Sequence, residues 1–158
     1  MKGLVYKSTG SWYSVKTESG NIYDCKIKGK LRLKNINSTN PVVVGDIVEF
    51  IVEEHDLQKI GIIQKIHDRR NYILRKSVNL SKQTHILASN IDLLLLVVTA
   101  KNPITTTSFI DRFLVSAEAY SIKTILVFNK CDIYDEDDHI LLNSMINIYD
   151  NIGYETLK

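Results

Sequence analysis

The sequence has few cysteines and no long apolar run, and these absences exclude several classes of protein. Cys25 and Cys131 are the only cysteines in 158 residues, too few for the disulfide framework of a small secreted domain. Neither stands at a metal-ligand spacing from the other or from a histidine. No apolar run approaches the roughly 18 residues that span a bilayer, and the N-terminus lacks a signal-peptide core. We therefore expect a cytoplasmic protein with reduced thiols and no membrane contact.

The charge is unevenly distributed, although the net charge is only +2. Residues 1–85 contain 15 Lys or Arg and 8 Asp or Glu, whereas residues 86–158 contain 5 and 10. A basic half followed by an acidic half suggests two units with different partners. The alternative is a solvated, lysine-rich surface without a nucleic-acid partner.

The first half of the chain has the pattern of short strands. Apolar and polar residues alternate, and turn residues separate the segments, which are residues 3–8, 12–17, 21–29, 42–54 and 59–68. Residues 31–41 read as a strand end followed by a polar loop, and five or six short strands in about 70 residues are typical of a small barrel or sandwich. A five-stranded OB barrel fits the count, but the pattern alone does not separate it from an SH3-like barrel. We assign residues 1–72 to this barrel and residues 73–88 to a basic connector, with room for one short strand at residues 71–77.

The second half has a different hydrophobic periodicity, which predicts alternating strands and helices. Residues 90–100 form a continuous apolar run, as expected for a strand covered on both faces in a parallel sheet. Helical periodicity follows at 105–122, where Ser108 and Asp111 have the spacing of a capping pair. A second buried strand and a second acidic helix come next, and we expect a third strand to open at residue 154. Residues 89–158 therefore predict a parallel sheet with helices.

A short polar motif follows the second buried strand directly. It reads Asn129-Lys130-Cys131-Asp132, and ligands of such sheets bind beyond the carboxyl ends of the strands. The Asp132 carboxylate can accept two hydrogen bonds from guanine, a donor pair that adenine lacks. Asn129 can reach the acceptor edge of the purine, the stem of Lys130 can lie across the base, and Cys131 would point into the fold. The alternative is a polar loop in which Asp132 is a helix N-cap.

The phosphate loop that normally accompanies this motif is missing from the chain. None of the seven glycines belongs to a G-x-x-x-x-G-K-[ST] sequence. One D-x-x-G sequence, which resembles the switch motif that binds the metal and the γ-phosphate, occurs at residues 150–153. We reject it, because it lies at the end of a helical pattern and its glycine is typical of a helix C-terminus. A base-recognition motif that precedes any phosphate loop does not fit an ordinary GTPase. It fits a circularly permuted one, in which the phosphate loop comes later.

Several stretches together resemble the RsgA (YjeQ) family of small ribosomal subunit biogenesis GTPases, over nearly the whole chain. Only NKCD is specific by itself, and the order of the stretches carries the resemblance: GSWYSVKT, YDCKIKGKLRL, VGDIVEF, RRNYILRKS, ASNIDLLLLVVTA, FIDRFLVSAEAY and LVFNKCD. The resemblance implies an OB barrel, a circularly permuted GTPase domain and a C-terminal zinc-binding domain.

The resemblance also implies an activity and partners. They are GTP hydrolysis with Mg²⁺, stimulated by the small ribosomal subunit during its late maturation, and contacts with ribosomal RNA; we expect a monomer. The phosphate loop, both switches and the zinc ligands would lie beyond Lys158. We therefore expect this chain to be the N-terminal portion, with no catalytic or metal-binding residue of its own and little or no hydrolysis.

Two basic clusters are candidates for RNA contact. In the first cluster, basic residues occupy every second position of one segment, so on a strand they would all lie on one face: Lys26, Lys28, Lys30, Arg32 and Lys34. Trp12, Tyr13 and Tyr23 could stack on bases beside it, although Tyr6 and Tyr13 could equally belong to the core. The second cluster lies at the junction of the halves: Arg69, Arg70, Arg75 and Lys76. The alternatives are an edge strand protected by lysines and a solvated linker.

Two other functions remain open at this point. The chain could be a complete, non-catalytic OB-fold RNA-binding module with a degenerate α/β appendage, or an enzyme that uses another nucleotide.

In the leading interpretation the strand at residues 90–100 keeps an unpaired edge, so residues 86–158 should be marginally stable or aggregate in isolation.

Overall fold

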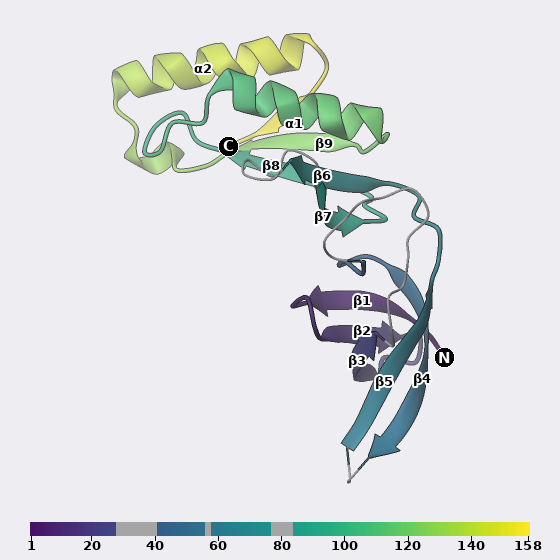
Figure 1. Ribbon diagram of the computed structural model, residues 1–158. Coiled ribbons are helices and arrows are strands. Elements are labelled where there is room, and N and C mark those ends of the chain that lie inside the picture. The colour runs from purple at the N-terminus through teal and green to yellow at the C-terminus, as the bar shows by residue number, and fades with distance from the viewer. Residues whose placement is uncertain (28–40, 56–57, 77–83) are drawn as a thin grey trace. The chain divides into compact units, whose positions relative to one another are not determined.

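The computed structural model describes residues 1–27, 41–55, 58–76 and 84–158. These residues form two compact units, Met1–Ile91 and Asp92–Lys158 (Figure 1). In this described part of the chain, no helix combines the length and apolarity needed to cross a membrane.

The first unit contains a closed five-stranded barrel. Its strands are β1 (Lys2–Ser8), β2 (Tyr13–Thr17), β3 (Ile22–Ile27), β4 (Ile47–His55) and β5 (Gln58–Ile66). They are arranged in the order β1-β2-β3-β5-β4, in which β3 and β5 are parallel and the other pairs are antiparallel. This order is that of an OB barrel, so the predicted fold is confirmed and the SH3-like alternative is excluded.

Alternation along the strands fills the barrel with apolar side chains. The buried core consists of Val5, Tyr13, Val15, Cys25, Val42, Val48, Phe50 and Ile63. Gly61 is required where β5 passes the core, because a Cβ there would collide with the sulfur of Cys25. Burial, reinforced by the neighbouring Asp24 carboxylate, raises the pKa of the Cys25 thiol to about 12.

A two-stranded antiparallel hairpin follows the barrel, formed by β6 (Tyr72–Lys76) and β7 (Thr84–Ser89). Strand β6 confirms the short strand expected at residues 71–77, whereas β7 was not predicted from the basic connector. A buried carboxylate attaches it to the barrel: Asp46 accepts hydrogen bonds from Nε and Nη2 of Arg69, both at 2.7 Å, and from the Ser89 hydroxyl at 2.6 Å. Gly45 allows this approach, because a Cβ there would overlap the Ser89 carbonyl oxygen.

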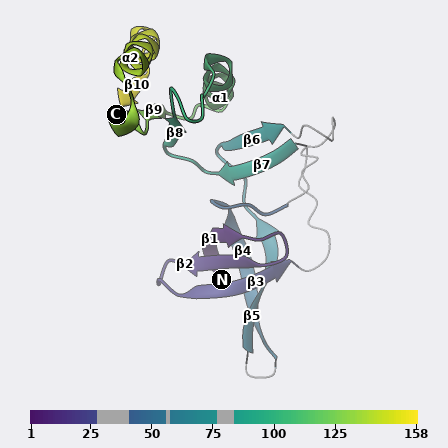
Figure 2. The same cartoon turned by 90° about the vertical axis from the view of Figure 1, so that its left-hand side faces the viewer.

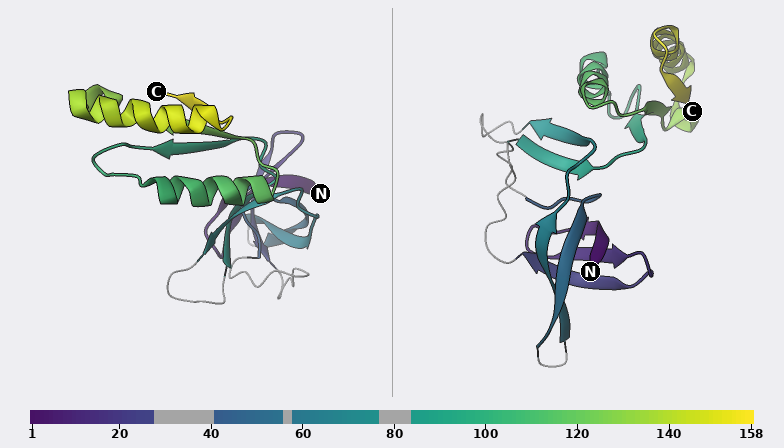
Figure 3. Two further views of the ribbon diagram at one scale, coloured as in Figure 1. Left: turned by 90° about the horizontal axis from the view of Figure 1, so that it is seen from above. Right: turned by 90° about the vertical axis from the view of Figure 1, so that its right-hand side faces the viewer.

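The second unit is a parallel sheet with helices, as predicted. Strands β8 (Leu94–Val98), β9 (Thr124–Phe128) and β10 (Glu155–Leu157) are parallel and lie in the order β10-β9-β8. Helices α1 (Thr107–Ala119) and α2 (Glu136–Asn151) cover the same face of this sheet (Figure 2). They lie side by side when viewed from above (Figure 3, left), and the Tyr149 hydroxyl of α2 donates to the Asp111 carboxylate of α1 at 3.0 Å.

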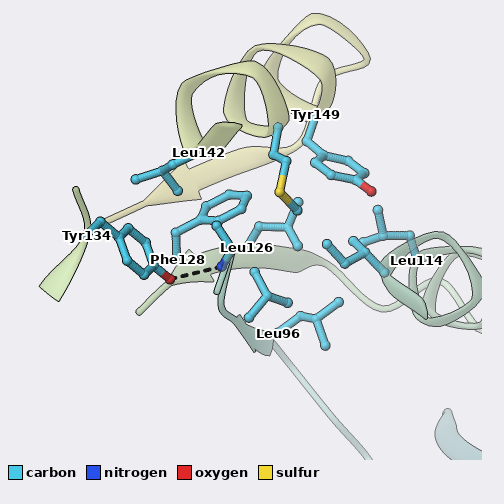
Figure 4. Packing of buried hydrophobic residues seen from close by; sticks show 11 residues of the cluster. Leu96, Leu114, Leu126, Phe128, Tyr134, Leu142 and Tyr149 are labelled. Atoms are coloured by element: carbon cyan, nitrogen blue, oxygen red, sulfur yellow. Dashed lines mark hydrogen bonds between the residues drawn. The ribbon is translucent and has the colours of Figure 1, made fainter. Parts of the chain in front are cut away.

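The core of the second unit lies between the sheet and its two helices. Figure 4 shows Leu114 of α1 and Leu142 and Tyr149 of α2 packed towards Leu96, Leu126 and Phe128 of the sheet. Helix α2 ends at Asn151, and Gly153 follows with a left-handed φ of +95°. This conformation confirms that the D-x-x-G sequence at 150–153 closes a helix.

The opposite face of the sheet differs from the prediction. Leu95 and Val97 of β8 are 54% and 56% exposed, and Leu157 of β10 is also exposed. The apolar run at residues 90–100 therefore has only one face covered by the described residues, and its pattern predicted two. A sequence pattern shows which faces of a strand are suited to burial. It does not show whether the residues that would cover those faces belong to the described part of the chain.

Candidate guanine-recognition site

The candidate site begins where β9 ends. Strand β9 is buried along most of its length, and the chain leaves the core at Phe128. The backbone N–H of Asn129 then donates to the carbonyl oxygen of Val98 at 2.8 Å. This bond joins the carboxyl ends of β8 and β9, so the polar motif stands at the edge of the sheet where α/β proteins bind their ligands.

The backbone of the motif turns sharply. Lys130 adopts the left-handed conformation with φ of 64°, and its N–H donates to the Asn129 side-chain oxygen at 2.9 Å. A single 3₁₀ turn, Cys131–Ile133, follows. Cys131 is partly buried against the core, and its thiol donates to the Phe128 carbonyl at 3.2 Å. The prediction that Cys131 points into the fold is therefore confirmed.

A buried tyrosine holds this turn in place. The Tyr134 hydroxyl donates to the carbonyl oxygen of Asn129 at 3.0 Å and accepts from the backbone N–H of Ala100 at 2.9 Å; Figure 4 marks the bond to Ala100. The sequence pattern did not single out Tyr134 as part of the site. An aromatic residue two positions after Asp132 was the available signal, but its partner lies 34 residues away in the sequence.

The cap of α2 decides between the two interpretations of Asp132. The N-cap is Asp135, whose carboxylate accepts from the backbone N–H of Asp138 at 2.9 Å in a capping box. Asp132 lies one residue inside the 3₁₀ turn and is exposed. The alternative in which Asp132 caps a helix is therefore wrong, and its carboxylate has no capping role that would explain it.

Two lysine side chains, one in the motif and one in the loop after β8, bind neighbouring segments. The Lys130 ammonium donates to the carbonyl oxygen of Asn102 at 2.6 Å, so its stem reaches back across the loop after β8. Lys101 binds Asp138 at 2.8 Å and Asp135 at 3.5 Å. The hydrogen bond to Asp138 raises the pKa of Lys101, and the backbone hydrogen bond from Asp138 lowers the pKa of Asp135. These contacts fix the start of α2 beside the recognition loop.

The turn presents the types of group that base recognition requires. An exposed carboxylate, a side-chain amide and an alkyl-ammonium stem stand on one rigid turn that backbone and tyrosine bonds hold. The described residues contain no group of three His, Cys, Asp or Glu that could hold a metal ion. The arrangement therefore suits base recognition, while phosphate and metal binding would need other residues.

The structure separates the predicted RNA-binding residues into several groups. Lys26 is exposed on β3, and its ammonium lies 4.1 Å from the centre of the Trp12 ring. Lys28, Lys30, Arg32 and Lys34 lie outside the described residues. Arg75 and Lys76 have their backbones in β6. The exposed Arg70 donates to the carbonyl oxygens of Asn90 and Ile91.

Two residues need correction as RNA contacts. The Arg69 side chain is only 5% exposed, because its guanidinium is engaged by the buried Asp46 carboxylate; this geometry argues against phosphate contact. Tyr13 is 1% exposed, which confirms the alternative that it belongs to the barrel core and leaves it no face to offer a base. Tyr23 packs against Phe50, with ring centres 5.4 Å apart. Trp12 is therefore the remaining stacking candidate of the three.

Comparisons with known proteins agree with this architecture. The family model "RsgA GTPase" matches residues 66–158, and "RsgA N-terminal domain" matches residues 2–63. A small ribosomal subunit biogenesis GTPase RsgA from Christiangramia forsetii is 57% identical and covers 99% of this chain and 50% of its own length. One from Bacteroides fragilis is 56% identical and covers 100% and 50%.

Solved structures give the same result. The chain superposes on YjeQ from Thermotoga maritima with a TM-score of 0.68 at 33% identity, covering 98% of this chain and 50% of that one. YloQ, described as a circularly permuted GTPase, gives 0.63 at 29% identity, with 99% and 50% coverage. The chain thus spans about half the length of the curated relatives it matches.

Proposed function

The chain belongs to the RsgA GTPase family, and from this membership we propose that it contributes guanine recognition and RNA binding to a GTPase of small ribosomal subunit biogenesis. The proposal follows the function for which its relatives are named. Asn129, Lys130 and Asp132 read the base, and the barrel binds ribosomal RNA.

The observation that carries the proposal is the position of Asp132. Its carboxylate stands on the turn that follows β9, at the ligand-binding edge of the sheet, and it caps no helix. A carboxylate only accepts hydrogen bonds, and guanine offers two adjacent donors on its base-pairing edge. Binding of adenine would leave the carboxylate without those donors, so the site discriminates strongly between the two bases.

Catalysis requires more than these residues. Phosphate positioning and Mg²⁺ supply most of the rate of a GTPase, and the described residues contain neither a phosphate loop nor a metal cluster. We therefore assign GTP hydrolysis, Mg²⁺ binding and the predicted zinc site to the parts of the relatives that lie outside their match with this chain. On the same basis we propose a cytoplasmic monomer that acts on the small ribosomal subunit.

A chimera tests the proposal directly. In it, residues 1–158 are joined to the part of the Christiangramia forsetii relative that this chain does not match. We expect it to bind GDP at least about 100-fold more tightly than ADP, because a polar site rejects a base that leaves its groups unpaired. Isothermal titration calorimetry measures both affinities.

The chimera also tests the partner. Purified small ribosomal subunits should raise its rate of GTP hydrolysis, whereas the same amount of large subunits should not. Equal affinities for GDP and ADP would contradict guanine recognition. A rate that is the same with either subunit would contradict the role in small-subunit biogenesis and leave guanine recognition intact.

A further inference from the structure

The outer surface of the barrel carries a hollow that the guanine site does not use. It has a volume of about 300 Å³ and is lined by Lys7, Thr9, Trp12, Ser14 and Asp24. This volume is at the small end of the range for ligand pockets, roughly 300–1,000 Å³. Lys7 pairs with Ser14 across β1 and β2, and Ser14 pairs with Asp24 across β2 and β3. The lining is therefore fixed by the register of three strands.

We propose that this hollow binds one unpaired guanine base of a single-stranded RNA, stacked on Trp12 and read by Asp24. The inference rests on the proposed RNA-binding function of the barrel and names the feature of the RNA that the barrel selects.

Trp12 provides the stacking surface. It is 40% exposed, although an indole ring is a large apolar surface that proteins usually cover. The loop before β2 holds its backbone, because both the N–H and the hydroxyl of Thr9 donate to the Trp12 carbonyl oxygen, at 3.0 and 3.2 Å. An exposed aromatic ring on a fixed backbone is the element on which single-stranded nucleic acids stack their bases.

Lysines provide the charge that an RNA backbone requires. The Lys26 ammonium lies 4.1 Å from the centre of the Trp12 ring, and Lys7 lines the hollow itself. Both are exposed. Ammonium groups close to the stacking ring and to the hollow suit the phosphates that flank a stacked base.

Asp24 determines which base fits. A carboxylate repels phosphate, so its presence in the lining marks the place of a base edge and not of the backbone. Ser14 donates to one of its oxygens at 3.1 Å, and a carboxylate has about four acceptor positions in total. The remaining positions suit a base with two adjacent N–H donors, and among the four RNA bases that pair is found on guanine.

Trp12 is the only tryptophan in the chain, so its fluorescence reports on this hollow alone. The 158-residue chain is titrated with two fluorescein-labelled RNA hexamers, one of uracil only and one with a single central guanine. Tryptophan emission reports stacking, and anisotropy reports total binding. We expect quenching by the guanine hexamer, about tenfold tighter binding of it than of the uracil hexamer, and no quenching by a duplex of the same sequence.

Three variants separate the contributions. Asp24→Asn should abolish the tenfold preference for guanine. Glu18→Gln removes the same charge from an exposed position outside the hollow, and it should keep the preference. Trp12→Phe should weaken binding of the guanine hexamer by about fivefold or more in the anisotropy measurement.

The outcomes distinguish this inference from the function on which it rests. Binding of both hexamers without a change in Trp12 emission, or with equal affinity, would overturn the guanine site and leave RNA binding intact. The same holds if Asp24→Asn keeps the preference. No binding of any RNA would contradict the proposed RNA-binding function, and the guanine site would fail with it.

Discussion

At the scale of single residues, the same types of side chain have very different roles in this protein. Asp132 is exposed on a turn, whereas Asp46 is fully buried and holds the guanidinium of Arg69. Arg69 and Arg70 are neighbours in the sequence, yet only Arg70 is exposed. The basic run at 69–76 could not reveal this difference, because the partner of Arg69 lies 23 residues upstream. The NKCD motif, in contrast, depends on local order and was predictable.

The buried ion pair leads to a prediction about stability. Replacement of Arg69 by Met leaves the Asp46 carboxylate buried without its cation, which typically costs about 3–5 kcal/mol. Urea unfolding of the 158-residue chain, followed by the emission of Trp12 in the barrel, measures the loss. Lys65→Met is the control, because Lys65 and its partner Glu49 are both well exposed and such pairs contribute about 0–1 kcal/mol. Equal losses for the two variants would contradict the assigned role of Arg69.

At the scale of secondary-structure elements, the order of strands and helices followed from periodicity, but the helix starts did not. Helix α1 was expected to be capped by Ser108, and its N-cap is Thr106. Residues 105–108 are all Thr or Ser, and any of them could cap a helix. Burial decides among them, because Ile110, Leu114 and Ala117 must face the sheet. The pattern in the sequence cannot supply that constraint.

The capping box of α2 predicts a pH-dependent effect. In the folded chain the backbone hydrogen bond from Asp138 lowers the pKa of Asp135. Its contribution to stability is therefore present above the ordinary aspartate pKa of about 4 and is lost as pH falls through the lower folded value. Asp135→Ala should lower the urea midpoint at pH 7, and the difference from the unmodified chain should shrink as pH falls below about 4.

A neighbouring residue gives the control for this experiment. Glu136 is an exposed acid in the first turn of α2 and is not the N-cap. Glu136→Ala should change the midpoint at pH 7 less than Asp135→Ala does. If the effect of Asp135→Ala is the same at pH 7 and pH 3, its carboxylate does not act through the hydrogen bond to Asp138.

At the scale of the whole chain, the two units differ in how completely they bury their apolar surface. The barrel closes on itself and leaves no strand edge among its five members. In the second unit the described residues pair β8 with β9 only, and the face that carries Leu95 and Val97 is exposed. The sequence identified both architectures, but it could not show which surfaces would stay uncovered, because a strand pattern does not name its partner.

This difference predicts separate behaviour for the two units. Residues 1–91, produced alone, should unfold cooperatively in urea and remain monomeric. Residues 92–158 should associate, because a bare apolar face and an unpaired strand edge are sites of aggregation. Sedimentation velocity at several concentrations measures both. A monomeric second unit with a cooperative unfolding transition would contradict the account of its exposed face.

The most direct test of the central claim is the nucleotide preference of the chimera with Asp132 replaced by Asn. Guanine donates two hydrogen bonds to a carboxylate, whereas xanthine presents a carbonyl oxygen in place of the exocyclic amine, which suits the amide of Asn. Calorimetric titrations with GDP and XDP should show that the unmodified chimera prefers GDP and that Asp132→Asn reverses the order. If GDP binding is unchanged by the substitution, Asp132 does not read the base, and the assignment of this chain as a guanine-recognition unit is wrong.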